Sequence, residues 1–124
     1  MVQTLTHVKH KTDIERELAN ASLAQGKGNA GMARVCARRA AGWSIQIWLE
    51  RKGVDLQTPS AFDYIKHLRE QEDTPEKVVA ILNHLIAKAE HADGSEVHVF
   101  PVDVETFLAE TRWLCEQMLE EPLQ

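Results

Sequence analysis

Residues 26–31 read GKGNAG and have the G-x-G-x-x-G spacing of a loop that binds the pyrophosphate of a dinucleotide. Such a loop works only between a strand and a helix, where its glycines let the backbone approach the phosphates. Residues 12–25 instead have the apolar spacing of an amphipathic helix, and no alternation of strands and helices follows. The sequence therefore argues against a Rossmann domain and predicts that these glycines separate two helices.

Basic side chains near this segment keep anion binding open as an alternative. A helix start offers free backbone N–H groups to a phosphate or sulfate, and Lys27 and Arg34 lie close to the predicted start. Arg34 and Arg38 are four residues apart and share a helix face, whereas Arg39 points about 100° away. The candidate anion- or nucleotide-binding residues are Lys27, Gly28, Asn29, Arg34, Arg38 and Arg39.

The same three arginines have a purely structural interpretation. A guanidinium on a mostly apolar helix costs free energy unless it is paired or exposed to water. The expected partners are carboxylates of neighbouring helices. These are Glu15, Glu17, Glu105 and Glu110.

The other reactive side chains form no recognisable catalytic or metal-binding pattern. The six histidines, at positions 7, 10, 67, 84, 91 and 98, include no H-E-x-x-H motif. His84 is a general base by residue type, but no nucleophile is visible for it. Ser44 lies within a predicted helix and outside any G-x-S-x-G motif. We therefore predict no catalytic residue, no metal and no cofactor.

Three tryptophans are candidate interface residues, because tryptophan is enriched among residues that dominate binding energy. They are Trp43, Trp48 and Trp113. Trp43 and Trp48 are five residues apart and cannot share one helix face closely, so one of them is expected to reach outside the core of the monomer. A core position remains the alternative for each.

Five helices are predicted to position these residues. The first two span about 12–25 and 29–52. A third opens at 58–60 and runs to about 70, a fourth opens at 73–75 and runs to about 89, and a fifth follows Asp103 to about 119. A short extended piece is expected at 97–100, too short to found a sheet. The predicted fold class is an all-α, antiparallel up-and-down bundle of four to five helices.

The second helix is apolar around most of its circumference. Met32, Val35 and Trp43 follow one face, and Ala37, Ile45 and other apolar residues occupy much of the rest. A helix of this kind is surrounded by others, so we predict that it forms the centre of the bundle.

The 124 residues are expected to form one domain at 12–120, with a loose arm at 1–11 and a tail at 121–124. No apolar run reaches the about 20 residues that span a bilayer, and the first residues lack the apolar region of a secretory signal. We expect a cytoplasmic protein without membrane contact. Cys36 and Cys115 fall in predicted helices and are expected to be buried thiols, with a disulfide as the alternative.

Charge is unevenly distributed along the chain, whose formal net charge is −5. Residues 1–54 carry nine Lys or Arg and four Asp or Glu, whereas residues 55–124 carry five and fifteen. Such asymmetry favours self-association, or an anionic partner for the first half. The alternative is that the two halves interleave and largely cancel.

Three segments resemble the HEPN (higher eukaryotes and prokaryotes nucleotide-binding) superfamily. They are the Ala- and Arg-rich ARVCARRAAGWSIQIWLERKG, the following SAFDYIKHL, and the closing FPVDVETFLAETRWLCEQML. The resemblance covers about residues 12–120. It implies a four-to-five-helix antiparallel bundle that often dimerises.

The resemblance also implies a choice of functions, because HEPN proteins include ribonucleases and non-catalytic partners of nucleotidyltransferases. Catalytic members use an Arg-x(4–6)-His motif on one helix, and no histidine follows Arg34, Arg38 or Arg39 at that spacing. We therefore expect a non-catalytic homodimer or accessory subunit, with a nucleotidyltransferase as one such partner. The alternative is a nucleotide- or RNA-binding module, or a degenerate ribonuclease, that uses the Arg-rich central helix.

Overall fold

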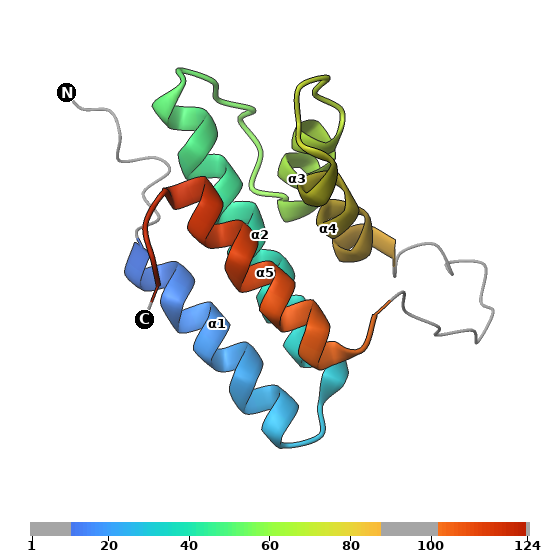
Figure 1. The fold of residues 1–124 in the computed structure, drawn as a ribbon. Coiled ribbons are helices and arrows are strands. Elements are labelled where there is room, and N and C mark those ends of the chain that lie inside the picture. Colours follow the sequence, from blue (N-terminus) through green and yellow to red (C-terminus); the bar gives the residue numbers. More distant parts are fainter. Residues whose placement is uncertain (1–10, 88–101, 124) are drawn as a thin grey trace.

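The computed structural model describes residues 11–87 and 102–123, and these residues form five α-helices (Figure 1). The helices are α1 (Lys11–Gly26), α2 (Ala30–Arg51), α3 (Ala61–Arg69), α4 (Glu76–Ile86) and α5 (Val104–Leu119). No strand occurs within the described ranges, so the all-α prediction is confirmed for them. The predicted arm, apart from Lys11, and the extended piece at 97–100 lie outside the described residues.

Three of these helices have a short polar side chain as their N-cap. The Asn29 side chain accepts a hydrogen bond from the Met32 amide (3.0 Å), and Asp103 accepts one from the Thr106 amide (2.8 Å). Ser60 does the same at the start of α3. Each satisfies an amide that has no partner inside its helix, which is why the helices start where the sequence predicts.

The predicted central helix, α2, packs against α1, α3 and α5. Ala37, Ala41 and Ile45 of α2 are fully buried in a core shared with α3, α4 and α5. A second cluster joins Ala40 of α2 to Ile14 of α1 and to α5. The apolar stripes therefore converge on α2, as its sequence predicts.

The helices do not alternate strictly in direction. Arg34 near the start of α2 bonds to Val102 just before α5, and Arg51 at the end of α2 bonds to Leu119 at the end of α5. Helices α2 and α5 therefore run parallel, and both run opposite to α1 (Figure 1). This parallel pair departs from the predicted up-and-down order. It arises because residues 52–60 return along α2, so that α3 starts beside the middle of α2.

The contact between α2 and the start of α3 depends on a glycine. A Cβ built on Gly42 would lie 2.6 Å from the Ala61 Cβ and 2.7 Å from the Ala61 Cα. Both distances are far below van der Waals contact, and the backbone of Ala61 cannot move aside like a flexible side chain. Gly42 therefore allows the start of α3 to approach α2 closely.

Replacing Gly42 with alanine is expected to destabilise the fold by about 1–3 kcal/mol, because overpacking outweighs the better helix propensity of alanine. Urea denaturation followed by circular dichroism measures the change. Gly31→Ala is the matched control, because its nearest neighbour would be the Asn29 Oδ1 at 3.8 Å. The control should be neutral or stabilising, and an equal loss in both variants would contradict the close-approach argument.

Candidate functional site

Residues 26–31 form a turn between α1 and α2. Gly28 has a φ of +79°, a left-handed conformation that favours glycine. The Asn29 amide donates to the Ala24 carbonyl (2.8 Å), and the Lys27 amide donates to the same carbonyl. These bonds satisfy a carbonyl in the last turn of α1, so the segment is a turn that ends one helix before the next begins. Lys27, Gly28 and Asn29 remain exposed at the start of α2, and anion binding there stays a prediction.

Arg34 points into the interior with 8% of its surface exposed. Its Nη2 donates to the Val102 carbonyl (3.3 Å), and its guanidinium lies 5.4 Å from the centre of the Phe107 ring. Burial lowers the pKa of Arg34, while the charge of Asp103 acts in the opposite direction. Arg34 therefore attaches the start of α5 to α2.

Arg38 lies one turn further along and is 7% exposed. Its Nε donates to the Leu85 carbonyl (2.8 Å), and its guanidinium lies 5.3 Å from the centre of the Phe62 ring. Leu85 is in the last turn of α4, where carbonyls lack intrahelical donors and the helix dipole favours a cation. Burial is the main cause that lowers the pKa of Arg38, followed by the charge of Arg34.

The predicted carboxylate pairing is confirmed for Arg39, whose Nη1 lies 3.0 Å from the Glu17 Oε2. For Arg34 and Arg38 the observed acceptors are main-chain carbonyls, and aromatic rings cover their guanidinium groups. The sequence could not indicate these acceptors, because every residue has a main-chain carbonyl and only the fold decides which one lies beside an arginine. The three arginines thus occupy separate environments.

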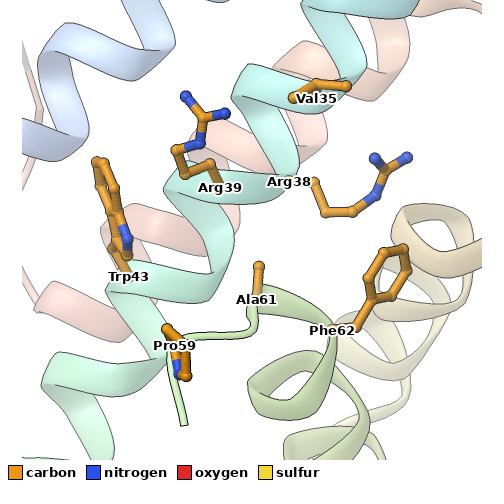
Figure 2. Close-up of a pocket in the computed structure, with 7 residues that line it drawn as sticks. All are labelled: Val35, Arg38, Arg39, Trp43, Pro59, Ala61 and Phe62. Carbon is orange, nitrogen blue, oxygen red and sulfur yellow. The ribbon is translucent and has the colours of Figure 1, made fainter.

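An open pocket of about 230 Å³ lies between α2 and the start of α3 (Figure 2). It is lined by Val35, Arg38, Arg39, Trp43, Pro59, Ala61 and Phe62. Figure 2 shows the Arg38 guanidinium turned toward Phe62 and α4, and the Arg39 guanidinium turned toward α1. The two charged ends therefore diverge, and the pocket is lined largely by apolar side chains and aliphatic stems. Phe62 was not among the predicted site residues, because its position beside Arg38 depends on how α3 packs against α2.

Two apolar residues of α2 are exposed although their spacing predicted burial. Met32 is 48% exposed and Val35 is 40% exposed. They share a helix face with Trp43, which is half-buried and lines the pocket. Apolar spacing shows that a side chain favours burial, but it does not show which element covers it. A charged residue on the same face, Arg39, was the signal that this side of α2 reaches solvent.

All three tryptophans are half-buried. Trp48 and Trp113 pack against the larger core cluster, each beneath an ammonium group: the Nζ of Lys52 at 4.7 Å and that of Lys77 at 4.1 Å from the ring centres. Trp43 packs against the smaller cluster and borders the exposed apolar face. The interface prediction is untested for all three, and Trp43 has the setting that fits it best.

The remaining polar groups have structural partners. The Nδ1 of His84 and the Oε1 of Glu110 are 2.7 Å apart and join α4 to α5. The buried Ser44 hydroxyl donates to the Ala41 carbonyl (2.8 Å). Cys36 and Cys115 are free, buried thiols, as predicted. Within residues 11–87 and 102–123, no three His, Cys, Asp or Glu side chains are grouped to hold a metal ion.

The fold and the site define an all-α bundle whose central helix holds two buried arginines and leaves one apolar face exposed. Comparison with protein-family models, with curated proteins and with solved structures gave no match to this chain. Of the helices in the described ranges, none combines the length and apolar character needed to cross a membrane.

Arg38→Ala is expected to lower the free energy of unfolding by about 2–3 kcal/mol, because it removes a buried charge-assisted hydrogen bond and the packing on Phe62. Arg16→Ala is the matched control. It removes an exposed ion pair with Asp13 on the surface of α1, so its cost should stay below about 1 kcal/mol. Urea denaturation of both variants measures the difference, and equal costs would contradict the assigned roles.

Alkaline pH is expected to destabilise the fold through Cys115. Burial raises the pKa of this thiol from 9.0 to about 12, so the unfolded chain loses the proton first. The stabilisation is complete below pH 9 and is lost as the pH rises toward 12. Stability measured across this range should fall more steeply in the wild type than in Cys115→Ala. Parallel curves would contradict the prediction.

Proposed function

We propose that this protein is a non-catalytic, HEPN-like helical bundle that acts by association. It forms a homodimer or serves as an accessory subunit, with a nucleotidyltransferase as one candidate partner. The observation that carries the proposal is the exposed apolar face of α2, where Met32 and Val35 lie beside Trp43.

Exposure of this face is informative because α2 is the central helix. Its other sides are buried against α1, α3 and α5, and its alanines at 33, 37, 40 and 41 have no exposed surface. Contiguous apolar surface on a folded domain marks a site where another molecule binds. A tryptophan at the edge of such a patch supports the same function, because tryptophan contributes large, rigid contact area.

The polar groups of the site also support association over catalysis. Arg34 and Arg38 donate to carbonyls inside the fold, and the Ser44 hydroxyl donates within its own helix. His84 pairs with Glu110. These groups stabilise the bundle and present no nucleophile beside a base. Among the six residues predicted to bind an anion or nucleotide, Lys27 and Arg39 are the exposed cations, and the net charge of −5 disfavours this RNA- or nucleotide-binding alternative.

The wild-type protein should sediment as a dimer at tens of micromolar in analytical ultracentrifugation. Met32→Glu places a charge in the apolar face and should weaken association at least about tenfold. Leu23→Glu is the matched control, because Leu23 is 62% exposed on α1 and lies on the side of that helix opposite the buried Ile14 and Leu18.

A wild-type monomer at this concentration would contradict the homodimer and leave the accessory-subunit form of the proposal. Equal weakening by the Met32 and Leu23 substitutions would show that any exposed charge disturbs association, and would remove the assignment to α2.

A further inference from the structure

We infer that two copies of this chain pack α2 against α2 in antiparallel orientation, with Arg39 of each copy facing Glu50 of the other. The inference rests on the proposed function and specifies its surface and its partner, a second copy.

Six residues of α2 define the surface, which we call the α2 stripe. They are Met32, Val35, Arg39, Trp43, Gln46 and Glu50. Successive members are three or four residues apart, so they follow one face of this 22-residue helix. Met32 and Val35 are exposed, the Arg39 side chain is 46% exposed, and the last three residues are half-buried.

The α2 stripe lies between the two neighbours that border it. Gly42 meets Ala61 at the start of α3 on one side, and Ala40 joins the α1 cluster on the other. Figure 2 looks onto this face, with Trp43 and Arg39 in front of α2 and the α5 ribbon behind it. Within the part of the chain that the structure describes, α1, α3 and α5 cover the other sides of α2. On this side the first half of the α2 stripe is exposed, and Pro59 lies beside Trp43 in the pocket at its half-buried second half.

Charge complementarity selects a second copy in antiparallel orientation. The α2 stripe carries its cation, Arg39, in the first half and its anion, Glu50, in the second half. A two-fold axis between Trp43 and Gln46 brings each Arg39 to the other copy's Glu50, whereas a parallel arrangement opposes like charges. A two-fold interface must be complementary to itself, and this charge pattern is, because the axis generates two equivalent pairs of Arg39 and Glu50.

The apolar residues agree with the same axis. Val35 lies nine to ten residues before the axis, and Val54, just beyond the end of α2, lies nine to ten residues after it, so an antiparallel partner brings the two valines to the same end of the interface. Val54 is 36% exposed and Val35 is 40% exposed, and both lose solvent contact in the dimer. Trp43 lies near the axis, where binding energy concentrates.

Contacts within one copy already position the side chains of Arg39 and Glu50 for pairing with the second copy. The Gln46 Nε2 donates to the Glu50 Oε2 (3.2 Å), which holds the carboxylate along the α2 stripe. The Arg39 Nη1 donates to Glu17 (3.0 Å), and a guanidinium has five N–H donors, so further donors serve an acceptor on the second copy. The Glu17 contact also reduces the rotamer freedom that Arg39 loses on binding.

A charge-swap experiment tests the inference. Arg39→Glu and Glu50→Arg alone should each weaken self-association at least about tenfold, because like charges then oppose each other twice. An equimolar mixture of these two variants should form a heterodimer, since both cross-pairs regain opposite charges. Lys66→Glu on α3 is the matched control, a charge reversal at an exposed position off the α2 stripe, and should not change association.

Sedimentation of each variant and of the mixture measures the outcome, with circular dichroism to show folding. A dimeric wild type whose single variants dimerise normally, or whose mixture stays monomeric, overturns the α2 interface and leaves self-association standing. A monomeric wild type overturns the homodimer itself. If Arg39→Glu unfolds because it places a second carboxylate beside Glu17, Glu50→Arg still decides: unchanged self-association overturns the inference.

Discussion

Two buried arginines on α2 connect this helix to the end of α4 and to the residue just before α5. Arg38 donates to the last turn of α4, and Arg34 donates to Val102 just before α5. Both side chains lie on α2, so one helix positions the residues on either side of 88–101. A guanidinium suits this task because it presents several donors, stays charged when buried and packs its face on an aromatic ring.

This arrangement directs the surface chemistry of the protein. Arg34 and Arg38 are turned inward, so these two charged side chains of α2 lie on the side that faces α4 and α5. The opposite side keeps Met32, Val35 and Trp43, with Arg39 bonded to Glu17 at its edge. The helix that organises the interior is thus also the helix with apolar surface available for a partner.

Much of the fold was predictable because its signals are local. Asn29 and Asp103 cap their helices through amides three residues away, and the apolar spacing of α2 indicated a helix packed on several sides. The parallel course of α2 and α5 was not predictable, since it depends on how residues 52–60 return along α2. The pocket was missed for the same reason, because Phe62 reaches Arg38 only after α3 folds back to Gly42.

The amino-acid sequence by itself indicated the approximate bounds of most of the helices, which helix is central, and that Cys36 and Cys115 are buried. These properties follow from capping, periodicity and composition, which act over a few residues. Only the tertiary structure decided that Arg34 and Arg38 bind carbonyls while Arg39 binds a carboxylate, and that Met32 and Val35 remain exposed. Those outcomes depend on which backbone atoms and side chains lie opposite each face of α2, and residues distant in the chain supply them.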